Sequence, residues 1–300
     1  AEAKQSEDTL GETDDFLTEK QDEAQEGIDA LQEEKDAIEE TKSTLQEEEE
    51  RLMNDRTEAV NDSVDWMAQW RDTREEIFAD KVGVIMARDL SKLYPNSTFV
   101  ADVKSTGLFA SDPELQKNGV KADYWKTGHS HMKRRVKEIG ALAGFEKSGH
   151  YFFNKPIGRG YDDGLVSAIA ILDMLDRNPD KTMADLRRDL PKTWGSPTMA
   201  PKCDDEIKYD VVDRVVARFQ DMKAKGETVA GQSITDLITV NGVRVVSEDG
   251  TWGLVRASSN KPELVVVVES PVSEDRLHAM FKAVDGVLRE NSEVGDYNQT

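Results

Sequence analysis

The period of hydrophobic and polar positions changes near residue 74. Before that point, an apolar residue recurs every seven positions, at Leu17, Ala24, Leu31, Ile38, Leu45 and Leu52. A coiled coil needs a second apolar stripe three residues further on, and those positions are mostly polar. The pattern predicts an acidic helical extension over residues 1–73 after a disordered start. It favours a solvated spacer over a specific dimerising coiled coil.

Beyond residue 74, short apolar strands alternate with amphipathic helices. Apolar residues at helical spacing predict helices over residues 79–93, 106–118, 131–139, 165–175 and 183–190. Short β-rich runs predict strands at residues 98–103, 122–125 and 151–153. This alternation predicts a three-layer α/β domain with a mainly parallel sheet over residues 74–194.

A cluster of breakers, Pro191, Gly195, Pro197 and Pro201, predicts a linker before a second domain. Beyond it, we expect a helix over residues 204–224 and β-rich pieces at 237–246, 252–257 and 264–269. Ser273 is a predicted N-cap for a closing helix that reaches about residue 288. Strands flanked by two helices predict a small α+β domain over residues 195–300.

The distribution of charge also differs between residues 1–73 and residues 74–300. Residues 1–73 hold 25 acidic and 7 basic residues, a net charge of −18, out of −21 for the chain. Residues 74–300 hold the other 35 acidic and 32 basic residues, a net of −3. Nucleic-acid phosphates require a basic face, so we expect no nucleic-acid partner. The helix in residues 1–73 is where we expect weak self-association or contact with a protein partner.

The sequence predicts neither a membrane span nor a secretory signal. It contains no apolar run of about eighteen residues, and its first residues lack an apolar signal core. The single cysteine, Cys203, excludes an intramolecular disulfide and fits a reducing compartment. We therefore predict a cytoplasmic location.

Four polar clusters stand at the ends of predicted strands, at residues 102–106, 126–130, 144–150 and 256–262. Open α/β sheets bind ligands beyond the carboxyl ends of their strands, so the first three clusters are expected to converge. The third places a carboxylate, a hydroxyl and an imidazole among glycines, which suits sugar hydroxyls. The fourth combines an arginine, two hydroxyls and an amide, which suits a phosphate dianion. Taken singly, each is also compatible with a solvated turn.

Together these clusters resemble the α-D-phosphohexomutase family, in its phosphomannomutase/phosphoglucomutase branch. The resemblance covers residues 75–300 and rests on four motifs in the family's order. These are Lys-Thr-Gly-His-Ser at 126–130, Gly-Phe-Glu-Lys-Ser-Gly-His at 144–150, Gly-Tyr-Asp-Asp-Gly at 160–164 and Arg-Ala-Ser-Ser-Asn-Lys-Pro at 256–262. It implies that the chain corresponds to the third and fourth of the family's four domains.

The resemblance also implies a role for each matching residue. Glu146 and Ser148 would bind the 3- and 4-hydroxyls of a hexose, and His150 would close that loop at the active site. Lys104 and His129 would position the substrate or move protons. The substrate's non-transferring phosphate would be held by Arg256, Ser258, Ser259, Asn260 and Lys261. Family members interconvert hexose 1-phosphates and 6-phosphates through a phosphoserine that Mg²⁺ bridges to an aspartate-rich loop.

Two family motifs have no counterpart in this sequence. One is the phosphoserine motif of the first domain. The other is the magnesium loop, Asp-Gly-Asp-Gly-Asp-Arg, whose place just before residue 75 is taken by Trp-Arg-Asp-Thr-Arg at 70–74. One aspartate does not reproduce a three-carboxylate site, so we assign no metal ligand. Phosphoryl transfer depends on positioning and on metal charge, so we expect this chain by itself to be inactive or nearly so.

Three hypotheses follow for function. By lineage the chain is a mutase for mannose or glucose 1-phosphate and 6-phosphate. The missing nucleophile favours a non-catalytic module that binds a sugar phosphate. In the third hypothesis the acidic helix drives association and the α/β body is a passenger, which the incomplete heptad pattern argues against. A fusion, a fragment, a degenerate copy or an artificial recombination would each give this sequence.

Overall fold

The computed structural model describes residues 25, 27, 31–32, 34–48, 50–52 and 77–297, and divides the chain into two compact units at residues 1–76 and 77–300. The described residues of the first unit are helical. Leu31, Ile38, Leu45 and Leu52 are each 60–67% exposed, as a solvated helix requires. Leu17, Ala24 and the residues at the expected magnesium loop lie outside the described part. The solvated spacer and its alternative, a dimerising coiled coil, both stay predictions.

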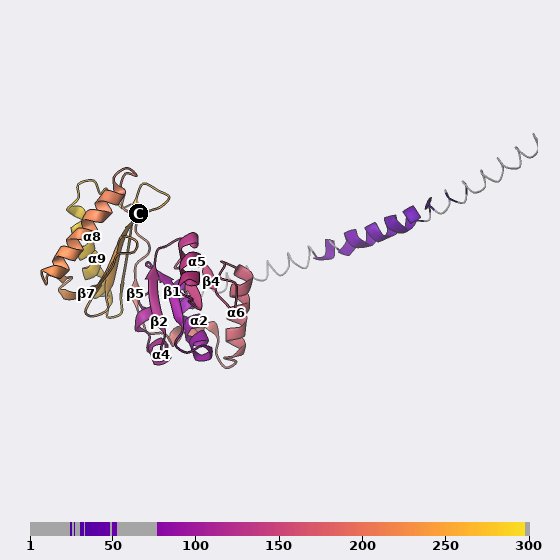
Figure 1. The fold of residues 1–300 in the computed structure, drawn as a ribbon, viewed down its shortest axis with the longest axis horizontal. Coiled ribbons are helices and arrows are strands. Elements are labelled where there is room, and N and C mark those ends of the chain that lie inside the picture. Colours follow the sequence, from indigo (N-terminus) through magenta and orange to yellow (C-terminus); the bar gives the residue numbers. More distant parts are fainter. Residues whose placement is uncertain are drawn as a thin grey trace, which may run out of the picture. The chain divides into compact units, whose positions relative to one another are not determined.

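The second unit begins with a four-stranded sheet in the order β2-β1-β3-β4 (Figure 1). Its strands are β1 (Thr98–Asp102), β2 (Lys121–Trp125), β3 (Ala143–Phe145) and β4 (Tyr151–Phe153). The first three are parallel and β4 is antiparallel to β3, so the predicted mainly parallel sheet is confirmed. Parallel pairing places the carboxyl ends of β1, β2 and β3 at one edge.

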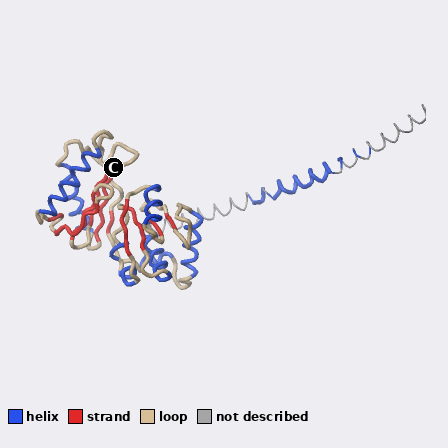
Figure 2. The backbone as a smooth tube through the Cα atoms, in the orientation of Figure 1, coloured by secondary structure: helices blue, strands red, loops and turns tan. Residues whose placement is uncertain are grey.

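Alternating side chains give this sheet two buried faces, as a three-layer domain requires. Phe99, Ala101 and Phe145 face one set of helices, whereas Val100 and Phe152 pack on the other side against α5 (His129–Glu138). The first set comprises α2 (Ala79–Leu93), α3 (Leu108–Ser111), α4 (Pro113–Lys117), α6 (Gly164–Asp176) and α7 (Met183–Arg188). Figure 2 shows the strands between these helical layers.

Two predictions for this domain were wrong. The single helix expected at residues 106–118 is two short helices, because Pro113 lacks an N–H and the Asp112 side chain caps α4 by accepting from Glu114 N and Leu115 N. The second error was to place residues 144 and 145 in a loop, whereas they belong to β3. Gly144 suits this packed strand, since a Cβ there would stand 2.6 Å from Val136.

A six-stranded antiparallel sheet follows, in the order β5-β10-β9-β8-β7-β6. Its strands are β5 (Trp194–Gly195), β6 (Thr228–Val229), β7 (Gln232–Ile238), β8 (Val243–Ser247), β9 (Trp252–Ala257) and β10 (Leu264–Ser270). The prediction of one β piece at residues 237–246 was wrong. Those residues form a hairpin, because Gly242 has a positive φ of 72° and turns the chain between β7 and β8.

The second sheet uses both faces for packing. One face carries alternate residues such as Val245, Val255 and Val266, which pack against α8 (Lys208–Ala224) and α9 (Glu274–Arg289). The other face carries Leu254, Val265 and Val267, together with Trp252, which pack on Val103 after β1. The sequence prediction of a small α+β domain is thereby confirmed, and its free sheet face is occupied by the first domain.

Candidate functional site

Asp102, the last residue of β1, joins three of the predicted polar clusters. Its carboxylate is fully buried and accepts hydrogen bonds from Ser105 Oγ at 2.5 Å, Thr127 Oγ1 at 2.9 Å and Lys147 N at 3.2 Å. Lys104 Nζ lies 3.8 Å from Asp102 Oδ2. The loops after β1, β2 and β3 therefore meet around one carboxylate, at the edge where the parallel strands end.

Glu146 is held from the loop that begins α5. Its side chain is buried, and Oε1 accepts from Gly128 N at 2.6 Å. Oε2 lies 3.7 Å from His150 Nδ1. Burial raises the pKa of the Glu146 carboxyl above its ordinary value, against the opposing effect of the Gly128 N–H. One oxygen of Glu146 is thus used by the backbone, and the other faces the end of its own loop.

The rest of the 144–150 loop is open to solvent. Ser148 and His150 are exposed, and Ser148 Oγ lies 3.0 Å from His150 Nδ1. His150 Nε2 lies 3.8 Å from Asp162 Oδ2, in the Gly-Tyr-Asp-Asp-Gly motif. The loop is closed by hydrogen bonds from Glu146 N to His150 O and from Gly149 N to Glu146 O, each 3.0 Å long. This arrangement leaves a hydroxyl and an imidazole available to a ligand.

His129 is the first residue of α5 and is exposed. Its ring lies against Phe152, with 5.5 Å between ring centroids. Gly128 before it has φ of 121°, a conformation that favours glycine and that turns β2 into the helix. The side chains of His129 and Lys104 thus come from the first two of the loops that meet at Asp102.

Arg256, near the end of β9, is 8% exposed. Its Nη1 donates to Ala257 O at 2.8 Å, whereas its Nε has no hydrogen-bond partner among the described residues. Burial lowers the pKa of the guanidinium, and the nearby charges of Asp102, Glu146 and Tyr209 act in the opposite direction. Arg256 therefore lies within electrostatic range of Asp102 and Glu146 in the loops of the first domain.

The loop after Arg256 presents donors to solvent. Its base is closed by Ser258 N, which donates to Glu263 O at 3.0 Å. Ser259, Asn260 and Lys261 are exposed, and Ser258 is buried. The side chains of Ser258, Ser259 and Asn260 make no hydrogen bond within the described part of the chain. A buried arginine beside unused hydroxyl and amide groups is a suitable environment for a phosphate.

Comparison with known families decides the lineage. Residues 78–194 match the model for phosphoglucomutase/phosphomannomutase, alpha/beta/alpha domain III, and residues 202–287 match the model for the C-terminal domain of the same proteins. The chain belongs to the phosphoglucomutase/phosphomannomutase family. The family expectation from the sequence is thereby confirmed.

Individual phosphohexomutases agree with this assignment. A phosphomannomutase/phosphoglucomutase of Pseudomonas syringae is 33% identical over 209 residues, which are 69% of this chain and 42% of that protein. A phosphoglucomutase of Neisseria meningitidis is 33% identical over 211 residues, again 69% of this chain and 42% of that protein. The chain thus spans less than half the length of these relatives.

Solved structures share the fold. A phosphoglucomutase/phosphomannomutase family protein of Burkholderia thailandensis has a TM-score of 0.60 at 24% identity, covering 75% of this chain and 44% of that one. The parafusin phosphoglucomutase of Paramecium has a TM-score of 0.52 at 16% identity, covering 74% and 44%. Both support the fold of this phosphohexomutase chain.

The described residues do not fit the magnesium ion that the family resemblance implies. They contain no group of three His, Cys, Asp or Glu side chains that could hold a metal ion. Asp102 and Glu146, the buried acids of the site, are occupied by hydroxyl and N–H donors instead.

None of the helices in the described part is long and apolar enough to cross a membrane.

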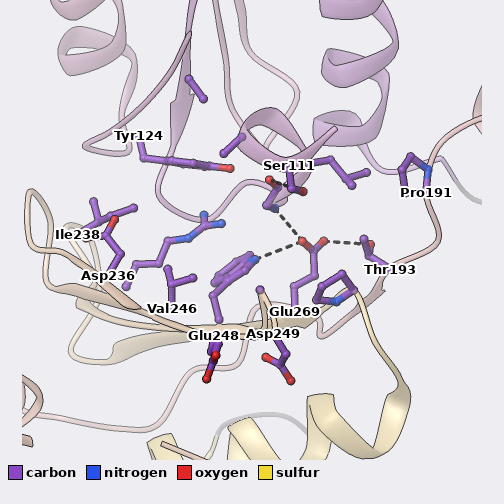
Figure 3. Close-up of a pocket in the computed structure, with 18 of the residues that line it drawn as sticks. Ser111, Tyr124, Pro191, Thr193, Asp236, Ile238, Val246, Glu248, Asp249 and Glu269 are labelled. Carbon is purple, nitrogen blue, oxygen red and sulfur yellow. Dashed lines mark hydrogen bonds between the residues drawn. The ribbon is translucent and has the colours of Figure 1, made fainter. Parts of the chain in front are cut away.

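A cavity of about 790 Å³ lies beside the second sheet, and none of the predicted site residues lines it (Figure 3). Several of its charged side chains are already paired, whereas the Nε of the buried Arg244 has no hydrogen-bond partner in the part of the chain that the structure describes. Asp123 pairs with Arg135, Asp249 with Arg276 and Glu269 with Lys81. Because residues of both sheets line this cavity and none of the predicted site residues does, we regard it as part of the contact between the two sheets, and place the candidate site at the loops around Asp102.

Sequence reasoning missed two groups at the candidate site. Asp102 was noted only as a member of a polar cluster, and Thr127, which donates to it, was not singled out. The available signal was an aspartate at the end of an apolar strand, since a buried acid at such a position needs donors from neighbouring loops.

Proposed function

We propose that this phosphohexomutase chain binds a hexose phosphate between the 144–150 loop and the 256–262 loop. Glu146, Ser148 and His150 would contact sugar hydroxyls, and Arg256, Ser258, Ser259, Asn260 and Lys261 would hold the phosphate. Lys104 and His129 would position the ligand from the loops around Asp102. The observation that carries the proposal is the Arg256 guanidinium, which is buried and whose Nε has no hydrogen-bond partner among the residues that the structure describes.

The proposed roles of the two loops follow from the chemistry of their side chains. A phosphate dianion supplies acceptors for Arg256 Nε and the 258–260 side chains, which have none within the described part of the chain. Charge-assisted hydrogen bonds of this kind are the strong ones. Sugar hydroxyls both donate and accept, which matches the Ser148 hydroxyl and the His150 ring. We therefore propose that residues 74–194 form the sugar-binding domain and residues 195–300 the phosphate-binding domain.

We further propose that the chain by itself binds ligand without turnover. Its relatives are named as phosphomannomutases and phosphoglucomutases, and the sequence of this chain contains neither the family's phosphoserine motif nor its magnesium loop. Phosphoryl transfer depends on metal charge and positioning, so binding would persist where transfer does not.

A cytoplasmic location also remains a proposal, supported by the buried Cys203, whose thiol pKa is raised by burial.

Titration calorimetry on the full chain tests the proposed ligand. Glucose 1-phosphate and mannose 1-phosphate should bind more tightly than inorganic phosphate, and glucose should bind least. Arg256→Ala should weaken every phosphate ligand by about tenfold to a hundredfold, the range for a lost hydrogen bond to a charged group. Glu146→Gln should reduce the advantage of the hexose phosphates over inorganic phosphate.

The matched control is Arg289→Ala, which removes an arginine that pairs with Asp285 on α9. It should leave every affinity unchanged. Hexose phosphate binding that survives both Arg256→Ala and Glu146→Gln would show that the site is assigned wrongly. A coupled mutase assay with magnesium should show no turnover, and robust turnover would refute the claim that this chain only binds.

A further inference from the structure

Helix α6 has an apolar face that no described residue covers. Leu165, Ile169 and Leu172 are 71%, 49% and 64% exposed, whereas Ala170 and Met174 on the opposite side are buried. Spacings of four and three residues place the exposed side chains along one line of the helix. Tyr161, 54% exposed, precedes the helix at its N-terminal end. Contiguous exposed apolar side chains of this kind mark an interaction surface.

Opposite charges stand near the two ends of this line. Lys133 Nζ lies 4.5 Å from the centre of the Tyr161 ring, at the N-terminal end. Asp176, the last residue of α6, is exposed and follows Ile169 by seven residues, which keeps it on the same line. Neither Lys133 nor Asp176 forms an ion pair with any residue that the structure describes. The face therefore runs from an unpaired cation, through three apolar residues, to an unpaired anion.

We propose that this face is an interface between two copies of the chain, with their α6 helices antiparallel about a twofold axis at Ile169. Leu165 would contact the partner's Leu172, and the two copies of Ile169 would meet at the axis. Lys133 would pair with the partner's Asp176. A twofold interface requires such a self-complementary surface, because each contact occurs twice. A parallel arrangement would place like charges together and is disfavoured.

The size of the face sets the strength of this contact. Helix α6 has 13 residues and is therefore about 20 Å long. Stable interfaces bury about 800 Å² on each partner, which exceeds what one short helix supplies. We therefore expect a weak, reversible dimer whose population rises with concentration.

Sedimentation velocity of the full chain over a concentration series tests this dimer. Ile169→Lys would bring two ammonium groups together at the twofold axis, and should raise the dissociation constant at least about tenfold. The matched control is Val272→Lys, because Val272 is also 49% exposed but follows β10 in the second sheet. It should leave the dissociation constant unchanged. Circular dichroism of each variant reports whether it folds.

A charge exchange makes the test specific to the antiparallel pairing. Lys133→Glu and Asp176→Lys should each weaken the dimer, because each places like charges opposite one another. The double variant restores opposite charges and should recover the original dissociation constant to within about threefold. A chain that is monomeric at every concentration, or a dimer that none of these changes affects, would overturn the proposal. The proposal would also be overturned if these variants lost binding to a different polypeptide, because the α6 face would then serve that partner.

Discussion

Buried charges in this chain serve different purposes according to how completely they are paired. Glu269 is 5% exposed and accepts hydrogen bonds from five groups, one of them Thr193, shown in Figure 3. The others are Lys81 Nζ, Thr106 Oγ1, Gly107 N and Trp252 Nε1. Arg256 is similarly buried, but its Nε is left without a partner in the described residues. A satisfied charge stabilises the fold, whereas an unsatisfied one is suited to a ligand.

Glu269→Gln tests the structural charge. Burial acts to raise the pKa of Glu269, but Lys81, the Gly107 N–H and Arg244 together hold it at about 2. Relative to an ordinary value of 4.5, this shift corresponds to about 3 kcal/mol of stability. The variant should lose about that free energy of unfolding at pH 7, measured by urea denaturation, because it leaves Lys81 buried without its anion.

The pH dependence of this loss follows from the sign of the shift. A depressed carboxyl pKa stabilises the fold fully above pH 4.5, and the stabilisation disappears as pH falls towards about 2. The difference between the parent chain and Glu269→Gln should therefore shrink across that window. Glu206→Gln, at an exposed position, should show no such difference. A Glu269→Gln loss that stays constant down to pH 2 would contradict the role given to this charge.

At the scale of elements, the sequence correctly predicted features that depend on residues close together in the chain, such as helix bounds and caps. The expected helix at residues 79–93 has those bounds in α2, and the predicted N-cap Ser273 accepts from Arg276 N at 3.2 Å. Strand β3 was missed because it has three residues, and its pairing with β1 and β4 defines it. The same limit applies to the site. The polar clusters were visible in the sequence, but the burial of Glu146 and the bridging role of Asp102 depend on tertiary packing.

Gly242→Ala tests how the β7–β8 hairpin supports the proposed phosphate loop. A Cβ at Gly242 would stand 2.1 Å from Val255 O and 2.7 Å from Arg256 Cα, and φ is 72°. Neither backbone atom can move without shifting Arg256, so we expect a loss of more than about 2 kcal/mol in unfolding free energy. Gly226→Ala is the matched control, since φ is 68° but nothing lies within 4 Å. It should cost about 1 kcal/mol. Equal losses in the two variants would show that conformation, and not the contact with β9, determines the cost.

At the scale of the whole 77–297 body, the candidate site depends on how the two sheets meet. Arg244 of β8 lies between Tyr124 and Trp252, at 4.1 Å and 3.6 Å from the two ring centroids. Its Nη1 donates to Val103 O at 3.0 Å and to Ser105 O at 2.7 Å. A residue of the second sheet therefore holds the loop that carries Lys104 and anchors Asp102. This contact joins the second sheet to the edge of the first sheet at which the proposed site lies.

Arg244→Ala should therefore affect a ligand that needs both sheets more than one that needs a single loop. In calorimetry we expect at least about a tenfold loss of affinity for glucose 1-phosphate, while inorganic phosphate, held by the Arg256 loop, changes by less than about twofold. Arg135→Ala is the matched control, because Arg135 also stacks on an aromatic ring, that of Trp125, and pairs with Asp123 inside the first domain. It should spare both ligands. Equal losses for the two ligands in Arg244→Ala would mean that Arg244 supports the phosphate loop itself, and not the relation between the sheets.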